Sequence, residues 1–563
     1  MKAFKDMSST AREANLENVD IHSIPFGEES LCTTCRAVFD FFLSAYKLKV
    51  PDQVSRALLV KLCTSLFTES VCQGVVDLNV PVFIEIQKRK PDLNSYQICG
   101  TIFEQYCVES PVVEWSLNIP GKNERTTQPN NSTSRRYRDA NQAQDTIEIV
   151  HVTDTHVDLK YAAEAKSTGC REPICCRNYQ GEPEAGDKAA GTWGSYPGCD
   201  IPMSSAEDTL TEAAANNKKY KYLYMTGDLI AHNLWETTQE SNSKQIQDQG
   251  ILFHEKFDGT KIFPVLGNHE PHPANVLAPL KINVPEYNGQ WLYEVFYDSL
   301  CKDLPPEAKT TFMKGGFYSV SPEEGFRVIG LNTLFGYGFN WWMILDPVDP
   351  ADQLAWLVEE LLEAERKKEK VHILMHGPTS EPDTLHVWSR EYHRVMERFQ
   401  DTVAAQFVGH THRDQFYLYY GQNTESDPYS VAWNGGSVTT YTDVNPNYKV
   451  YYVNHQNYMV EDIDTYIYNL TEANLNQGKS PDWFKLYSFK DAYDLPSLSY
   501  KDLDDLVTKL AVDDRYFRKY NLYFYKNSDV AYEQDCTGSC RQQQLCLIVS
   551  TANETECESI LSN

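Results

Sequence analysis

Five short polar clusters constrain this chain of 563 residues more than any other feature, because each directly follows an apolar run. The runs read TIEIVHVT, KYLYMT, KIFPVLG, VHILMH and AAQFVG, and their β-branched and aromatic residues are typical of buried strands. Helical stretches lie between them, which favours a layered protein of sheets and helices, where ligands gather at the carboxyl ends of strands. The clusters are Asp154-Thr155-His156, Gly227-Asp228, Gly267-Asn268-His269-Glu270, His376-Gly377 and Gly409-His410-Thr411-His412.

The clusters offer carboxylate, amide and imidazole groups, a mixture that suits a pair of divalent cations. Two such cations about 3.5 to 4 Å apart repel strongly, so the site needs anionic oxygen ligands and preferably one bridging carboxylate. Imidazoles complete the coordination, and mixed N and O donors suit Zn²⁺ while allowing Mn²⁺ or Fe. The donor types therefore favour Zn²⁺, with Mn or Fe as alternatives, and the family resemblance described next implies two such ions per chain.

In this order the clusters resemble the signature of the calcineurin-like metallophosphoesterases. The resemblance implies an α/β fold, with two packed mixed sheets flanked by helices and a binuclear metal site beyond the strand ends. It also implies that a water activated by both metals attacks phosphorus. The implied ligands are Asp154, His156 and His412 for one metal, Asn268, His376 and His410 for the other, and Asp228 as the bridge.

A phosphodiester with an alkoxide leaving group needs a proton on the departing oxygen. Two histidines are candidate donors: His269 directly follows Asn268, and His232 lies four residues after Asp228. For each, a purely structural histidine is the alternative. We expect Glu270 to orient His269 rather than to bind metal.

Residues 29–110 read as amphipathic helices punctuated by six cysteines, which by themselves allow 15 pairings. The pattern resembles a saposin B-type domain, a small all-α bundle that binds lipid. The resemblance implies docking on an anionic lipid surface, and a purely structural bundle is the alternative. It also implies the pairs Cys32–Cys107, Cys35–Cys99 and Cys63–Cys72.

Changes in composition divide the rest of the chain. Residues 1–28 are polar and expected to be flexible, and residues 111–144 form a proline-containing linker. The catalytic domain is expected at residues 145–455. Residues 456–563 read as a mostly helical C-terminal domain that carries the last four cysteines.

This domain order resembles the acid sphingomyelinase family over nearly the whole chain, and local runs such as TDTHVDLKY and TGDLIAHN support the match. The family implies hydrolysis of sphingomyelin in membranes to ceramide and phosphocholine. Tyr441 and the nearby Asn445 are candidate substrate contacts, because an aromatic ring attracts the quaternary ammonium of choline. A tyrosine that only packs a strand is the alternative. The implied pairs are Cys170–Cys175, Cys176–Cys199, Cys536–Cys540 and Cys546–Cys557.

One departure from the family concerns Cys301. Vertebrate members pair the corresponding cysteine with one that follows the HGP-type histidine, whereas HGPTSEPDTLHVW contains none. We therefore predict that Cys301 is unpaired, and either buried or capped.

Two other functions compete with this interpretation. A phosphodiesterase acting on nucleotides or other small substrates would use the same metal site, but paralogues of that kind lack a saposin domain. A lipid-binding protein with an inactive phosphoesterase domain is disfavoured because all seven ligand positions are filled.

The net charge of −28 argues against binding of nucleic acid and predicts repulsion from anionic membranes, which mild acid would weaken. A merely solubilising surface is the alternative. The sequons at Asn131, Asn469 and Asn553, together with the cysteines, predict glycosylation and a lysosomal or secreted protein. The N-terminus lacks the apolar core of a signal peptide. No run of about 18 apolar residues is present, so no membrane span is expected. We also expect a monomer.

Overall fold

The computed structural model describes most of the chain. The flexible N-terminus predicted for residues 1–28 lies outside the described residues except for its last position, as do residues 123–144 of the linker and the sequons at Asn131 and Asn553. The described residues are 28–50, 52–64, 66–104, 107, 113–122, 146–196, 198–216, 219–421, 427–476, 478–531, 536–549 and 557.

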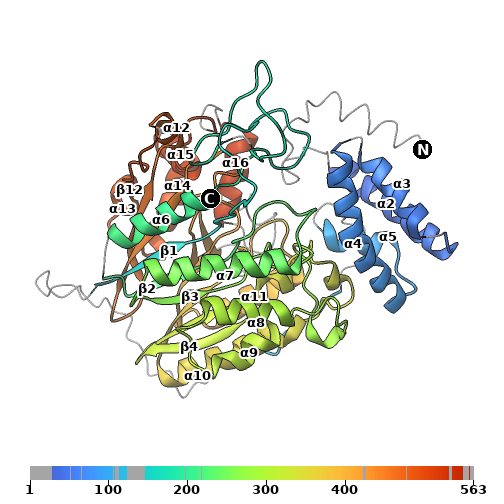
Figure 1. The fold of residues 1–563 in the computed structure, drawn as a ribbon. Helices are drawn as coiled ribbons and strands as arrows, with labels where there is room; N and C mark the ends of the chain where they lie inside the picture. The colour runs from blue at the N-terminus through green and yellow to red at the C-terminus, as the bar shows by residue number, and fades with distance from the viewer. Residues whose placement is uncertain are drawn as a thin grey trace, which may run out of the picture.

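Within these residues, two six-stranded sheets form the body of the protein (Figure 1). The first sheet has the order β12-β11-β10-β1-β2-β3, and β1, β2 and β3 are parallel. The second has the order β4-β5-β6-β7-β9-β8, in which β5, β6, β7 and β9 are parallel and the edge strands β4 and β8 are antiparallel. Both sheets are mixed, so the predicted fold class is confirmed.

The bounds of the strands follow. In the first sheet they are β1 (Thr146–Val152), β2 (Tyr222–Met225), β3 (Lys261–Pro264), β10 (Asn447–Asn454), β11 (Val460–Ile467) and β12 (Phe484–Ser488). In the second they are β4 (Tyr318–Glu323), β5 (Phe326–Gly330), β6 (Lys370–Leu374), β7 (Val403–Val408), β8 (Phe416–Tyr420) and β9 (Pro428–Asn434).

An aromatic core joins the two sheets. The ring of Tyr224 on β2 lies 4.9 Å from that of Phe407 on β7, and its hydroxyl is 2.7 Å from Nδ1 of His372 on β6. Because the central parallel strands are covered on both faces, they read as continuous apolar runs rather than as alternating ones. The covering helices are α6 (Met203–Asn216), α7 (Gln239–Lys256), α8 (Gln290–Leu300), α9 (Ala308–Gly315), α10 (Gln353–Lys367) and α11 (His386–Arg398).

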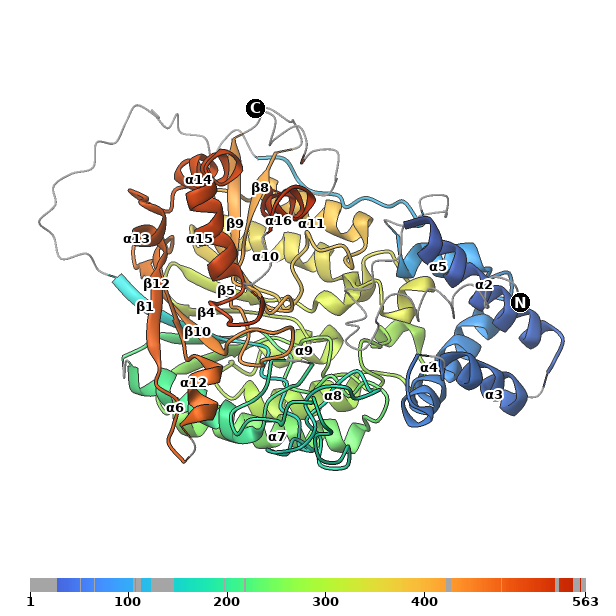
Figure 2. The same cartoon turned by 90° about the horizontal axis from the view of Figure 1, so that it is seen from above.

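The N-terminal bundle lies to one side of this body (Figures 1 and 2). It consists of α2 (Glu28–Lys47), α3 (Asp52–Cys63), α4 (Glu69–Arg89) and α5 (Ser95–Ile102), and it contains the disulfides Cys32–Cys107, Cys35–Cys99 and Cys63–Cys72. On its inner side, Phe83 of α4 packs 5.2 Å from Trp341 of η5 (Trp341–Ile344), whose indole N–H donates to the side chain of Asn79.

The described part of the linker does not run loosely between the domains. Its residues 113–122 lie along α11, where the backbone N–H of Leu117 donates to Glu391 at 2.8 Å and Trp115, Leu117 and Ile119 pack on the core of the second sheet. This segment therefore holds the bundle close to the body.

The first sheet continues past residue 455. The strands β11 and β12 pair antiparallel with β10 and with each other, so the domain boundary expected between residues 455 and 456 falls inside the sheet. The acidic residues in VEDIDTYI obscure its strand pattern in the sequence. Beyond β12 the chain is helical, as predicted, in α13 (Phe489–Tyr493), α14 (Tyr500–Val512), α15 (Asp514–Phe524) and α16 (Ser539–Val549). The shorter α12 (Leu470–Leu475) lies between β11 and β12, and its N-cap is the sequon residue Asn469.

Four more disulfides lie in the body and C-terminal region, at the pairs that the family resemblance implies: Cys170–Cys175, Cys176–Cys199, Cys536–Cys540 and Cys546–Cys557. Cys301 is free and buried, as predicted. In the part of the chain that the structure describes, no helix combines the length and apolarity needed to cross a membrane.

Candidate metal centre

The five polar clusters meet at the carboxyl ends of parallel strands from both sheets. Because β1, β2 and β3 run in one direction, their C-terminal loops emerge together, and β6 and β7 bring two further loops from the second sheet. The groups carried there are Asp154 and His156 after β1, Asp228 after β2, Asn268 after β3, His376 after β6, and His410 and His412 after β7.

The first set of predicted ligands is compact and buried. The Nε2 atoms of His156 and His412 are 3.1 Å apart. Oδ1 of Asp154 lies 3.4 Å from Nε2 of His412 and 3.7 Å from Nε2 of His156. The three donor atoms therefore face a common point.

The donor atoms of the second set of predicted ligands also lie close together. Nε2 of His376 is 2.9 Å from Oδ1 of Asn268 and 3.2 Å from Nδ1 of His410. The neutral amide of Asn268 supplies an oxygen without adding a charge to the pair of carboxylates.

Asp228 stands between the two sets. Its Oδ2 atom is 3.0 Å from Nε2 of His376 in the second set and 3.4 Å from Nε2 of His156 in the first. Its Oδ1 atom accepts the backbone N–H of His269 at 2.8 Å. This is the position that a bridging carboxylate requires.

Each of the four imidazoles uses its other nitrogen to contact an oxygen outside the cluster. Such a contact selects the tautomer and fixes the ring, as is usual for histidines that bind metal. The contacts run from Nδ1 of His156 to the carbonyl of Ile230 (2.7 Å), from Nδ1 of His376 to the carbonyl of Thr226 (2.6 Å), from Nε2 of His410 to the carboxylate of Asp383 (3.0 Å), and from Nδ1 of His412 to the carbonyl of Tyr441 (3.3 Å).

The backbone at this centre adopts left-handed conformations that side chains other than glycine rarely take. The φ angles of Asp154, His156, Asp228, His410 and His412 lie between 41° and 74°. Strain of this kind costs of order 1–3 kcal/mol per residue and persists only where the surroundings enforce it.

Two glycines bring the loops after β2 and β3 into contact. A Cβ atom on Gly227 would lie 2.4 Å from the backbone nitrogen of Gly267, and one on Gly267 would lie 2.1 Å from Oδ1 of Asp228. Gly227 also has a φ of 95°. Only glycine fits at these two positions.

The donor set and its electrostatics fit a pair of divalent cations. Burial alone would raise the pKa of Asp228, yet His376 and His269 hold that pKa well below its ordinary range. Burial opposes the charged form of His156, but Asp154 and Asp228 raise its pKa to about 9. The buried carboxylates thus attract positive charge, and their mixed O and N partners suit first-row divalent metals.

Comparisons with known proteins agree with this geometry. The family model for calcineurin-like phosphoesterases matches residues 147–414, and that for the acid sphingomyelin phosphodiesterase C-terminal region matches residues 434–560. The sphingomyelin phosphodiesterase of Bos taurus is 32% identical over 93% of this chain and 82% of its own length. The chain belongs to the sphingomyelin phosphodiesterase family.

Two further relatives align over different shares of the chain. Sphingomyelin phosphodiesterase 1 of Caenorhabditis elegans is 32% identical over 92% of this chain and 91% of its own length. A cyclic GMP-AMP phosphodiesterase of Rattus norvegicus is 30% identical over 71% of this chain and 88% of its own length. The match to the family model for the C-terminal region begins at residue 434, the last residue of β9.

In this member of the sphingomyelin phosphodiesterase family, both predicted proton donors lie beside the metal ligands. The ring of His269 is 4.6 Å from that of His156, and its Nε2 atom is 4.0 Å from Oδ2 of Asp228. The ring of His232 stacks 4.1 Å from His156 and lies 4.6 Å from His269. The two histidines therefore lie next to each other at the centre.

The structure corrects the role expected for Glu270. Its carboxylate accepts the backbone N–H groups of Gly267, Asp228 and Leu229 at 2.6, 3.1 and 2.6 Å, whereas Nδ1 of His269 contacts the carbonyl of Ala231 at 3.2 Å. Glu270 thus binds the two ligand loops together rather than orienting the His269 ring. The sequence gives no sign of this, because two of the bonds join residues 41 and 42 positions apart along the chain.

The two predicted substrate contacts differ. Tyr441 lies at the centre, with its ring 3.9 Å from that of His232. Asn445 is fully buried: its carbonyl oxygen accepts the hydroxyl of Tyr196, and its amide donates to the carbonyls of Lys526 and Asn527. The prediction that Asn445 contacts substrate is therefore wrong, because its polar atoms join segments of the protein.

Asp383 is a candidate functional residue that sequence reasoning missed. Its carboxylate lies 3.0 Å from Nε2 of the predicted ligand His410, and it belongs to HGPTSEPDTLHVW, a segment that was informative in the sequence only for its missing cysteine. An aspartate in a loop carries no periodic signal, so only the fold shows that it meets His410.

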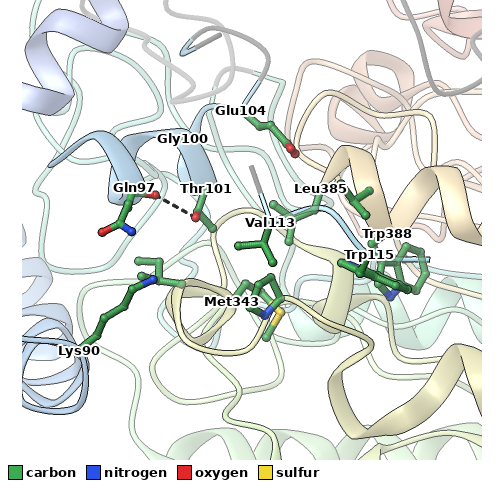
Figure 3. A pocket seen from close by; sticks show the side chains of 13 residues that line it. Lys90, Gln97, Gly100, Thr101, Glu104, Val113, Trp115, Met343, Leu385 and Trp388 are labelled. Carbon is green, nitrogen blue, oxygen red and sulfur yellow. Dashed lines mark hydrogen bonds between the residues drawn. The ribbon is translucent and has the colours of Figure 1, made fainter. Parts of the chain in front are cut away.

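The cavity between the N-terminal bundle and the body is separate from the metal centre (Figure 3). It has a volume of about 120 Å³ and lies between α5, the linker segment and α11, where Thr101, Val113 and Trp388 contribute to its wall. None of the seven predicted ligands lines it.

Replacing the bridging carboxylate should remove metal from both halves of the centre. We expect Asp228→Asn to lower the metal content from about two ions per chain to one or fewer, because both sets lose their shared anionic ligand. Elemental analysis of the purified protein measures this. Asp208→Asn, which changes a half-buried aspartate of α6, should keep the full content, and an unchanged content in Asp228→Asn would contradict the bridging assignment.

Proposed function

We propose that this chain is a zinc-dependent sphingomyelin phosphodiesterase that hydrolyses sphingomyelin to ceramide and phosphocholine. One observation carries the proposal: relatives named for this activity align over 92–93% of the chain. A nucleotide diester is the second candidate substrate, because the relative named for cyclic GMP-AMP aligns over 71% of the chain.

The chemistry divides between the metals and the chain. When bound, two divalent cations neutralise the charge of the phosphodiester and lower the pKa of an attacking water. Asp228 holds the two halves of the centre at a fixed separation. His269 and His232 lie within 4.6 Å of each other and of the ligand His156, a position from which either can give a proton to the departing ceramide oxygen.

Tyr441 is the candidate contact for the choline group. Its ring is half-buried and stacks on that of His232 beside the centre. A quaternary ammonium is attracted to such a ring face. This attraction would hold the choline end of the substrate at Tyr441, beside the centre.

The N-terminal bundle is the proposed membrane contact. Its inner side packs on η5, whereas Leu48, Val54 and Leu58 are 78%, 48% and 43% exposed. Val54 and Leu58 are four residues apart on α3, so they share one face of that helix. Both ribbon views place α3 on the side of the bundle away from the sheets (Figures 1 and 2). A lipid surface would cover these side chains.

The compartment is part of the proposal. Seven disulfides support folding in an oxidising route, so we assign the chain to the lysosome or the extracellular space, as a glycosylated monomer. At mildly acidic pH its negative charge, −28 at neutral pH, would be smaller, which favours approach to an anionic bilayer.

The proposal is tested with purified protein and Zn²⁺ at about pH 5 and pH 7. The protein is offered sphingomyelin in anionic vesicles and, separately, a nucleotide diester. We expect phosphocholine release from the vesicles. Turnover of the nucleotide alone would overturn the assignment in favour of the second candidate.

Removing the first proton donor should separate catalysis from metal binding. His269→Ala is expected to lower kcat on sphingomyelin by about 100-fold or more, because the alkoxide would leave without its proton. The metal content should stay at the wild-type level, and His254→Ala in α7 should change neither quantity. Loss of metal from His269→Ala would show instead that His269 is a ligand.

Charge on the exposed face of α3 should lower hydrolysis of substrate in a membrane but not hydrolysis of a soluble substrate. The double variant Val54→Asp and Leu58→Asp is expected to lower sphingomyelin hydrolysis in vesicles by about tenfold or more, because two apolar side chains no longer enter the lipid. Hydrolysis of soluble bis(4-nitrophenyl) phosphate should be unchanged. Equal activity of variant and wild type on vesicles would refute docking through α3.

A further inference from the structure

The cysteine-bearing loop at residues 158–201 ends beside the candidate proton donor His232. The disulfide Cys176–Cys199 closes this loop, and Val157 forms backbone bridges to both Ile201 and Ile230. These bridges place the end of the loop alongside the segment that follows Asp228. Asp200 is the residue delivered there.

Asp200 is a fully buried carboxylate with three hydrogen-bond partners. Its Oδ2 atom accepts the backbone N–H of His232 at 2.7 Å, and its Oδ1 atom lies 2.8 Å from Nδ1 of the same histidine. Oδ1 also accepts the hydroxyl of Thr439 at 3.1 Å. A carboxylate accepts from N–H groups, so this contact assigns the proton on Nδ1 to the bond with Asp200.

The ring of His232 is held on both faces as well. It stacks on His156 at 4.1 Å with an angle of 29°, and on Tyr441 at 3.9 Å with an angle of 18°. Rotation about the side-chain bonds would break both stacks and the bond to Asp200. The imidazole therefore has one position, with Nδ1 directed at Asp200.

We propose that Asp200 is a positioning residue: its two contacts with His232 hold the imidazole in one orientation, in which Nε2 points away from Asp200 and toward the leaving oxygen. This inference rests on the proposed function, because it assigns His232 a catalytic part in phosphodiester cleavage. It gives the disulfide-closed loop a purpose that the metal site does not explain.

Two bonds to phosphorus change in the proposed step. Water forms a new bond to phosphorus and releases one proton to solvent. The bond from phosphorus to the ceramide oxygen breaks, and its electron pair stays on that oxygen, which takes the proton from Nε2 of His232. The imidazole returns to the neutral form, with Nδ1–H still bonded to Asp200.

A different use of His232 is also visible in the geometry. One of its nitrogens lies within 4.8 Å of nitrogens of His156 and His412, close enough for the three imidazoles to hold one metal. In that arrangement Asp200 would support a metal ligand. The two roles differ in what Asp200→Asn would disturb: the placement of a proton donor in one case, and the binding of a metal in the other.

The experiment compares two substrates in Asp200→Asn, which keeps the size of the side chain and removes its charge. On sphingomyelin, whose leaving group is an alkoxide, we expect kcat to fall about 10- to 100-fold with KM unchanged. On bis(4-nitrophenyl) phosphate, whose leaving group departs without a proton, we expect no change. Asp208→Asn is the matched control and should match wild type on both substrates.

Three further measurements complete the test. The double variant Asp200→Asn with His232→Ala should be no slower than His232→Ala alone, because both changes remove the same proton transfer. Metal content should equal that of wild type. Thr439→Val, which removes one bond to Asp200, should show a smaller loss on sphingomyelin alone, and it serves as the test variant if Asp200→Asn does not fold.

Equal losses on both substrates, additive losses in the double variant, or loss of metal would each overturn the positioning role. Failure of the proposed function reads differently: wild type would then cleave bis(4-nitrophenyl) phosphate but not sphingomyelin. In that case a nucleotide diester with an alkoxide leaving group replaces sphingomyelin in the same comparison.

Discussion

The buried carboxylate of Asp228 is the constraint on which the rest of the structure depends. One oxygen faces histidines from both ligand sets, and the other accepts a backbone N–H, so the anion fixes loops from both sheets at once. The left-handed φ of Asp228 and the contact between Gly227 and Gly267 are consequences of that position. The carboxylate of Glu270, which binds three backbone N–H groups of the same loops, holds the strained arrangement in place.

The N-terminal bundle and the reacting centre are joined by a continuous apolar contact. Val71 of α4 packs with Ile174 and Trp235 of the body, and Phe67 and Tyr441 pack on the same cluster. Since Tyr441 also stacks on His232, the domain proposed to meet the membrane reaches the candidate choline contact and a candidate proton donor through one cluster. The disulfide-closed loop contributes to both, through Ile174 in the cluster and Asp200 behind His232.

The parts of the site that the sequence predicted are those carried by local signals. A strand followed by glycine and a side chain able to bind metal is a pattern within a few residues, so the sequence predicts seven ligand positions, and the structure brings these side chains together. The parts it mispredicted involve contacts between distant segments. Glu270 binds the loop after β2 rather than its neighbour His269, and Asn445 joins the C-terminal region rather than the substrate. The strand β11 was read as part of a helical domain because its pattern is acidic.

The sequence by itself determined the family, the metal-binding groups and the unpaired state of Cys301, because these depend on residue identity and short-range order. Only the tertiary structure decided which carboxylate contacts which histidine. Asp200 and Asp383 are ordinary loop aspartates in the sequence, and only the fold places them against His232 and His410. The physical reason is that a hydrogen bond depends on distance and direction in space, and residues 27 or 32 positions apart along the chain show neither until the strands and loops between them are in place.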